Sequence, residues 1–242
     1  MSGPIADVSA RKGRQNEHAD AVRSMFDRIA PRYDLLNRVL SAGIDQRWRS
    51  DAIAALRPKP RARVLDLCAG TLDVTQGLAD AYPDVSLTAA DFAAEMLERG
   101  KHKVPTAERV VADAMALPFA DASFDAAVCS FGIRNVSITQ KALQEVRRVL
   151  TPGSRFVTLE FFRSSRPITR SWSASFARVV LPAVGQALAG DAAAYRYLSD
   201  SMAKFLSRAE YESLLRSVGF CNVSGIDLTL GIASLVVAEV PS

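Results

Sequence analysis

The sequence predicts an α/β fold built on a mostly parallel sheet. From Arg63 onward, short apolar runs alternate with helical patterns, which favours parallel strands joined by right-handed crossovers. The stretch 64–73, VLDLCAGTLD, reads as a strand, a turn of small residues and the start of a helix, as in nucleotide pockets. A second apolar run, 85–90, ends in Asp91, where such folds place a carboxylate for a ribose. Two strand-end carboxylates, Asp66 and Asp91, therefore predict a bound nucleoside.

Composition indicates a soluble globular protein. The chain has 242 residues, 49% hydrophobic and 23% charged, enough for one domain with a full core. The net charge of +4 does not call for a nucleic-acid partner, and none is expected. Neither an apolar run of about 18 residues nor a secretory signal is seen, so a cytoplasmic location is expected.

Cysteine and histidine usage argues against a metal site. The three cysteines show no CxxC spacing, so we expect small buried apolar residues in a reducing compartment rather than a disulfide or metal ligands. Only His18 and His102 are present. A zinc site or a histidine-based catalytic triad is therefore not expected.

The N-terminal part predicts a helical cap. Residues 1–16 are expected to form a flexible tail and 17–242 a single domain, with the cap at 17–60. Apolar residues follow a helical spacing after Glu17: Val22, Met25, Phe26, Ile29 and Tyr33. This stripe favours a helix that simply covers the core. For the polar and aromatic segment 32–37, a covering role and a place in a cavity wall are equally open.

The other elements follow from the same periodicities. Strands are expected at 63–68, 86–91, 108–112, 124–130 and 154–161. Helices are expected at 45–56, 72–82, 93–102, 139–150 and 206–219, with Pro152 and Gly153 ending the fourth. The runs 220–228 and 231–239 predict a closing β-hairpin.

Residues 161–206 predict a helical insertion after the fifth strand. Arginines occur between Phe161 and Gly190, but Asp and Glu do not. On a helix, Trp172 and Phe176 would lie opposite most of these arginines. Such a helix suits a membrane surface or an acyl-chain groove, while a lid with merely solvated arginines is an equal alternative.

The predicted carboxyl ends of the strands are rich in acids and poor in bases. An anionic dinucleotide fits poorly, because the turn after the first strand lacks a full GxGxxG pattern and contains no Lys or Arg. A cationic nucleoside fits better. S-adenosylmethionine, with a positive sulfonium and ribose hydroxyls that a carboxylate can accept, is the expected cofactor.

Five stretches then point to one family: MFDRIAPRYDLLNRVLSAGIDQRWR, VLDLCAGTLDVT, ALPFADASFDAAVCSFGIRNV, EVRRVLTPGSRFVTLEFF, and GDAAAYRYLSDSM with LLRSVGF. Through them the sequence resembles the S-adenosylmethionine-dependent demethylmenaquinone and polyprenyl-benzoquinol C-methyltransferases. The resemblance spans nearly the whole chain past residue 22. It implies a Rossmann-like, seven-stranded class I methyltransferase sheet, mostly parallel with an antiparallel last strand. One departure is Leu72, where the family usually has Gly, and its side chain could crowd the cofactor.

The resemblance also implies cofactor contacts. The family pattern assigns Thr71, Asp91, Asp113, Ala114 and Ser130, and the strand–turn–helix pattern adds Asp66 and Gly70. Asp91 would accept hydrogen bonds from the ribose hydroxyls, and Asp113 one from the adenine amino group.

The reaction class sets further expectations. Attack by an aromatic carbon on a methyl sulfonium needs a reduced quinol with a hydroxyl at least partly deprotonated. Arg134 is predicted to stabilise that phenolate or orient a water with Asn135, although a structural ion pair is its alternative role. Tyr33 and Asp34, on a flap over the site, are the second choice.

The sequence therefore predicts C-methylation of a reduced polyprenyl quinone precursor. Predicted substrate contacts are Phe131, Trp172 and Phe176. Peripheral contact with the inner membrane face and a homodimer are compatible with the sequence. Two alternatives are a methyltransferase for another phenolic acceptor and a non-catalytic protein with a closed cofactor site that docks on membrane or nucleic acid. A nicotinamide dehydrogenase is disfavoured by the incomplete phosphate cradle.

Overall fold

The computed structural model describes residues 21–41, 43–163 and 192–242. The strands are β1 (Arg63–Leu67), β2 (Ser86–Asp91), β3 (Glu108–Val111), β4 (Phe124–Ser130), β5 (Leu150–Glu160), β6 (Cys221–Leu228) and β7 (Ala233–Glu239). The labelled helices are η1 (Ala30–Arg32), α2 (Tyr33–Ser41), α3 (Ile44–Leu56), α4 (Asp73–Ala81), α5 (Ala94–Gly100), η2 (Ile133–Asn135), α6 (Thr139–Val149), α9 (Ala192–Lys204), α10 (Arg208–Ser217) and η4 (Thr229–Gly231). The predicted tail, 1–16, and most of the predicted insertion lie outside the described residues.

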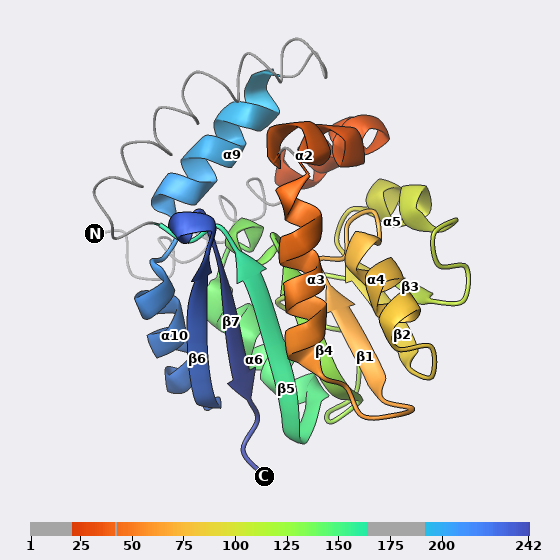
Figure 1. The fold of residues 1–242 in the computed structure, drawn as a ribbon, viewed down its shortest axis with the longest axis vertical. Helices are drawn as coiled ribbons and strands as arrows, with labels where there is room; N and C mark the ends of the chain where they lie inside the picture. The colour runs from red at the N-terminus through yellow and green to blue at the C-terminus, as the bar shows by residue number, and fades with distance from the viewer. Residues whose placement is uncertain (1–20, 42, 164–191) are drawn as a thin grey trace, which may run out of the picture.

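All seven strands form one sheet in the order β3-β2-β1-β4-β5-β7-β6 (Figure 1). The pairs along β3, β2, β1, β4 and β5 are parallel, whereas β7 is antiparallel to both β5 and β6. The predicted fold class is therefore confirmed, with its antiparallel last strand. The strand order reverses direction where β1 lies between β2 and β4, and the crevice at such a point is where open α/β sheets bind ligands.

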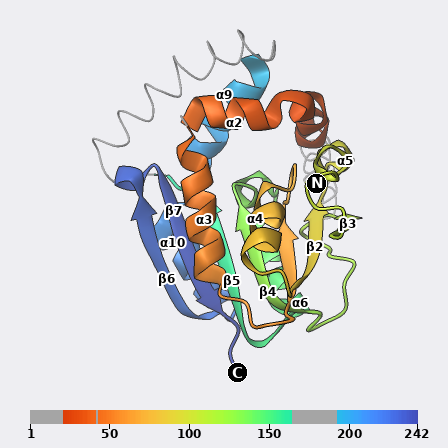
Figure 2. The same cartoon turned by 45° about the vertical axis from the view of Figure 1, so that its right-hand side comes forward.

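Alternate residues of each strand face opposite sides of the sheet, and each side has its own apolar core. Val64 of β1 packs with residues of α3 and α4, whereas its neighbours Leu65 and Leu67 pack with residues of α6 and α10. Figure 2 shows α3 and α4 in front of the sheet. A parallel sheet covered on both faces leaves its strand ends as the natural place for a site.

One predicted boundary is wrong. Pro152 and Gly153 do not end a helix, because α6 ends at Val149 and β5 begins at once at Leu150. The pairing of β4 with β5 shifts register between Phe124 and Ala126, and an irregular pairing tolerates a proline that has no N–H to donate. Gly153 has a φ of +73° and donates its N–H to Val240 O at 3.0 Å.

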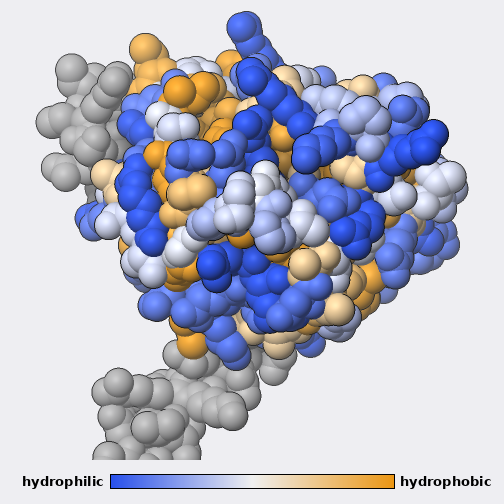
Figure 3. All heavy atoms as spheres, turned by 90° about the horizontal axis from the view of Figure 1, so that it is seen from below, coloured by the Kyte–Doolittle hydropathy of each residue, from blue (hydrophilic) through white to orange (hydrophobic). Residues whose placement is uncertain are grey.

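The cap contains more helix breaks than the apolar stripe suggested. Residues 21–29 are helical, η1 follows at Pro31, and Tyr33 begins α2 instead of ending the first stripe. The cap lies across the carboxyl ends of the parallel strands, beside α9 (Figures 1 and 2). Figure 3 shows the opposite face, where hydrophilic residues predominate.

Candidate active site

An open pocket lies at the carboxyl ends of β1, β2 and β4, under the cap. Its empty space, open solvent included, is about 820 Å³. Its lining includes Arg23, Tyr33, Gly70, Asp91, Asp113, Ala114, Ser130, Phe131 and Asn135. Eight of the predicted site residues thus surround one cavity, whereas Asp34, Asp66, Thr71 and Arg134 lie outside its lining. Trp172 and Phe176 belong to the part of the chain that the structure does not describe.

The turn after β1 alternates left-handed residues: Cys68, Gly70 and Leu72 have φ of 55°, 53° and 66°. Left-handed φ is costly for a leucine, which explains why glycine would be favoured at this position. The Leu72 side chain is fully buried and packs with Ala89 and Leu97 instead of lining the pocket. The departure from glycine therefore leaves the cavity open.

Asp91 joins the turn to the end of β2. Its Oδ2 accepts a hydrogen bond from Gly70 N and its Oδ1 one from Ala93 N, both at 2.8 Å. Burial raises the pKa of Asp91 to about 6, although these N–H groups, which stabilise the ionised form, act in the opposite direction. Each carboxylate oxygen retains a lone pair for a ligand hydroxyl.

Asp66 lies deeper than Asp91. Thr75 donates its Oγ1–H to Asp66 Oδ2 at 2.6 Å, and Oδ1 has no hydrogen-bond partner among the described residues. Burial raises its pKa to about 7. Asp66 is therefore a buried carboxyl group next to the turn, which its hydrogen bond with Thr75 connects to α4.

The far wall carries polar groups from the ends of β3 and β4. Asp113 is exposed and accepts a hydrogen bond from Met115 N at 2.8 Å through Oδ1. The Ser130 hydroxyl is buried without a hydrogen-bond partner among the described residues. An unsatisfied buried hydroxyl at a cavity wall is available to a ligand.

Aromatic rings form a second wall. Phe131 stacks on Phe161, with ring centroids 4.5 Å apart, and Trp48 lies 6.2 Å from Phe131. Trp48 is fixed by donating Nε1–H to Thr229 Oγ1 at 2.9 Å. Of these three rings only Phe131 lines the pocket, so the cluster fixes the Phe131 side chain in the cavity wall.

Arg134 is held in a buried ion pair with Glu160. Its Nη1 donates to Glu160 Oε1 at 2.7 Å and to Phe131 O at 2.6 Å. The two side chains are only 6% and 0% exposed, and burial raises the pKa of Glu160. The next residue, Asn135, lines the pocket and accepts a hydrogen bond from the Tyr197 hydroxyl of α9 at 3.2 Å.

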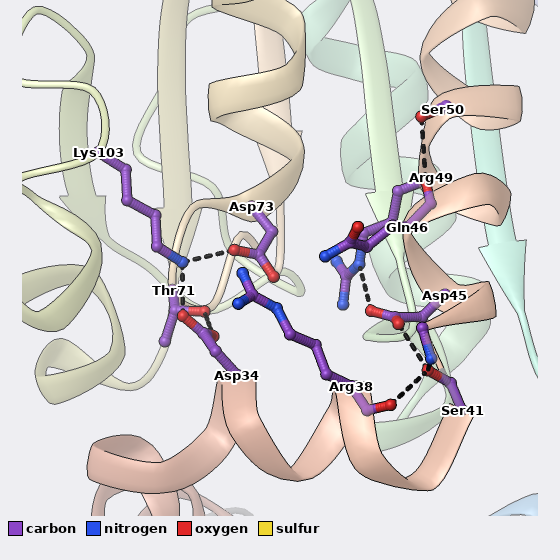
Figure 4. Close-up of polar contacts among 11 residues, drawn as sticks. Asp34, Arg38, Ser41, Asp45, Gln46, Arg49, Ser50, Thr71, Asp73 and Lys103 are labelled. Carbon is purple, nitrogen blue, oxygen red and sulfur yellow. Dashed lines mark hydrogen bonds and ion pairs between the residues drawn. The ribbon is translucent and has the colours of Figure 1, made fainter.

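The cap is tied to the turn by a polar cluster (Figure 4). Thr71 donates its hydroxyl to Asp34 of α2. Lys103 pairs with Asp34 at 2.6 Å and also with Asp73 at the start of α4, and its side chain is 12% exposed. Asp34 thus connects the cap to the turn rather than facing the cavity.

Tyr33, the neighbouring cap residue, does face the cavity. Its ring lies 4.0 Å from the position that a Cβ on Gly70 would occupy. Burial raises the pKa of Tyr33, outweighing the charges of Arg49 and Arg134. Sequence reasoning missed Arg23, Lys103 and Tyr197, which have no spacing relative to the strand ends that would reveal them.

Comparison with known proteins decides the family. The profile described as ubiE/COQ5 methyltransferase family matches residues 12–239. The chain belongs to that family. It is 44% identical over 217 residues to the ubiquinone/menaquinone biosynthesis C-methyltransferase UbiE of Syntrophotalea carbinolica, covering 88% of this chain and 91% of that protein. Identity to the demethylmenaquinone methyltransferase of Deinococcus radiodurans is 40%, over 94% and 95% of the two chains.

Solved structures support the fold of this family member. A SAM-dependent methyltransferase from Thermotoga maritima superposes with a TM-score of 0.65 at 18% identity, covering 89% of this chain and 98% of that one. A Haemonchus contortus phosphoethanolamine N-methyltransferase in complex with S-adenosylhomocysteine gives 0.63 at 14% identity, covering 80% and 52%. Among the described residues, no helix has the length and apolar character needed to span a bilayer.

Proposed function

We infer that this protein transfers a methyl group from S-adenosylmethionine to a ring carbon of a reduced polyprenyl quinone precursor, either demethylmenaquinol or the corresponding benzoquinol. Membership of the family supports the reaction and the acceptor class. The observation that carries the assignment to this pocket is Asp91, a buried carboxylate at the end of β2. Each of its two oxygens accepts a hydrogen bond from a backbone N–H group, which fixes the orientation of the carboxylate.

The residues present fit the methyl donor. Asp91 would accept hydrogen bonds from the two ribose hydroxyls, and Asp113 would accept one from the adenine amino group. Leu72 does not obstruct the pocket side of the turn, because its side chain packs into the core. When bound, the donor supplies an electrophilic methyl group on a positively charged sulfur.

The acceptor ring lies against the Phe131 wall, between the donor site and the cap. Arg134 provides positive charge close to Phe131 and Asn135, which favours the phenolate form of the quinol. Its guanidinium is held by Glu160, so Arg134 acts as a fixed charge and not as a base. Asn135, oriented by Tyr197, holds a hydroxyl or a water. In the transfer, the ring carbon would gain the methyl group as the methyl–sulfur bond breaks, with the electron pair left on the departing neutral sulfur of S-adenosylhomocysteine. The proton on that ring carbon would then pass to a water, which restores the aromatic ring.

The long apolar tail of such an acceptor calls for contact with a bilayer. We propose peripheral docking through the strand-end side of the molecule, where Leu35 of α2 is 55% exposed and Leu230 of η4 is 80% exposed. Trp172 and Phe176 are proposed contacts for the tail. Undiminished activity of the Trp172→Ala, Phe176→Ala double variant on a tailed substrate in anionic vesicles would contradict that role.

The central experiment incubates the protein with methyl-labelled S-adenosylmethionine and each quinol precursor, in reduced and oxidised form. We expect a C-methylated product from a quinol and none from a quinone, because an oxidised ring is itself an electrophile. Transfer to oxygen would refute the assigned chemistry. Transfer only to untailed phenols would instead support the alternative acceptor class.

A further inference from the structure

Arg49 of α3 is a largely buried cation. Its side chain is 13% exposed and forms an ion pair with Asp45, one turn earlier on the same helix, with Nε and Oδ2 3.5 Å apart. Figure 4 marks this ion pair with a dashed line. The Nε of Arg49 has no hydrogen-bond partner among the described residues. Asp45 is itself engaged by Ser41, whose hydroxyl donates to Asp45 Oδ1 at 2.6 Å.

The guanidinium of Arg49 contacts a residue of the pocket wall. The guanidinium carbon lies over the Phe131 ring, 5.4 Å from its centroid, and Phe131 lines the cavity. The charge of Arg49 also acts to lower the pKa of Tyr33 and of Asp66. Tyr33 lies over Gly70 and Asp66 is the penultimate residue of β1, so the charge of Arg49 acts close to the turn that follows β1, although Arg49 is not itself among the lining residues.

A cation at this position would offset the repulsion between the carboxylate of the donor and the carboxylates of the pocket. The methyl donor carries an α-carboxylate at its amino-acid end, and the charged residues in the described lining are two carboxylates, Asp91 and Asp113, and one cation, Arg23. Neighbouring carboxylates repel a carboxylate in a medium of low dielectric constant. Arg134 is paired with Glu160, and the guanidinium carbon of Arg23 lies over Phe92, 5.9 Å from the ring centroid.

We propose that Arg49 binds the α-carboxylate of the methyl donor. This inference rests on the donor site described under the proposed function. A guanidinium offers a fork of N–H donors that matches both oxygens of a carboxylate. Because Arg49 is not among the lining residues in this structure, its side chain would have to rotate past Phe131 to present Nε and the neighbouring Nη to the carboxylate. Arg49 thereby also fixes the sulfonium end of the donor relative to the aromatic wall.

Paired ligands test the proposal by calorimetry. S-adenosylmethionine and decarboxylated S-adenosylmethionine differ only in the carboxylate. Relative to the parent protein, we expect Arg49→Gln to bind S-adenosylmethionine about 10- to 100-fold more weakly, the range of a charged hydrogen-bonded contact. Its affinity for the decarboxylated ligand should change less than threefold. Arg49→Lys should recover part of the loss. Arg47→Gln, an exposed position on the same helix, is the matched control and should bind both ligands as the parent does.

Three results would overturn the assignment. Equal losses for both ligands in Arg49→Gln would mean that Arg49 only supports the fold. Unchanged affinity for S-adenosylmethionine with a higher KM for the quinol would place the charge on the acceptor. If the parent protein binds neither ligand, the donor site itself is refuted, and that outcome is distinguishable because it does not involve the variant.

Discussion

Replacing Leu72 by glycine sets two effects of opposite sign against each other. Leu72 has a φ of 66° and is fully buried among Ala89 and Leu97. Glycine would relieve a left-handed conformation that costs about 1–2 kcal/mol. Loss of the buried side chain costs about 2–5 kcal/mol, as in other large-to-small core substitutions. Packing therefore outweighs strain, and we expect Leu72→Gly to unfold more easily than the parent by about 2 kcal/mol.

Leu72→Ala separates the two effects. Alanine loses nearly as much packing but keeps the left-handed penalty, so it should be less stable than Leu72→Gly by about 1 kcal/mol. At roughly 2–4 °C per kcal/mol for a chain of this size, glycine should lower the Tm by about 4–8 °C and alanine by a few degrees more. Thermal and urea unfolding, each followed by circular dichroism, measure both differences.

Affinity for S-adenosylhomocysteine in the same variants tests where the side chain points. Because Leu72 packs away from the cavity, affinity should change less than threefold in either variant. An alanine variant at least as stable as the glycine variant would refute the backbone argument. Much tighter binding by Leu72→Gly would show that the leucine crowds the ligand after all.

Three further predictions concern charged groups. Lys103→Met should lower the free energy of unfolding by about 1–3 kcal/mol, because it leaves two partly buried carboxylates facing each other. The cap should then be cleaved faster by proteases. Lys101→Met is the control: the partner of Lys101 is exposed, so its free energy of unfolding should stay within about 0.5 kcal/mol of the parent. Affinity for the methyl donor should fall as pH drops through about 6, since the pKa of Asp91 is raised from 3.8 to about 6 and only the ionised carboxylate favours a cation. Titration calorimetry in buffers of different ionisation enthalpy would detect the proton that Asp91 releases on binding. An affinity that does not change with pH would contradict this prediction. Glu160→Gln should lower the free energy of unfolding by about 3 kcal/mol, because it leaves the buried Arg134 without its partner. The freed guanidinium should also lower kcat without changing the affinity for the methyl donor. An unchanged kcat would contradict a positioning role for Glu160.

The same raised pKa values predict the pH dependence of stability. In the unfolded chain Asp91 ionises near 3.8, but in the folded protein only near 6. Folding therefore favours the protonated carboxyl, and this contribution to stability is complete below pH 4 and is lost as pH rises through 6. Asp66 extends the loss to about pH 7. Binding of a cation would reverse the trend, since it stabilises the ionised carboxylate of Asp91.

The parts of the site that follow strands could be predicted from the sequence. Apolar runs mark the ends of parallel strands, and those ends meet at one edge of a sheet. Asp91, Asp113 and Ser130 were found in this way, and the structure brings all three to one cavity.

Residues that reach the site from other elements had no such signal. Lys103 lies in a loop after α5 and joins Asp34 to Asp73 through side chains far apart in the sequence. The cap was predicted, but the break at Pro31 turns Tyr33 to the pocket and Asp34 to the turn, which periodicity alone could not separate. Tertiary contacts, not local propensity, decide such placements.

Asp91 poses a difficulty for any simple test of the donor site, because it both builds and serves the pocket. Its carboxylate oxygens accept hydrogen bonds from Gly70 N and Ala93 N. Asp91→Asn would turn an amide NH₂ toward one of these N–H groups, so the turn would distort even without a ligand. Lost binding would then have two causes. Asp113 is exposed and its one described hydrogen bond is local, to Met115 N. Asp113→Asn therefore changes the ligand contact with little change in the backbone, and its effect on affinity reports recognition of the adenine amino group.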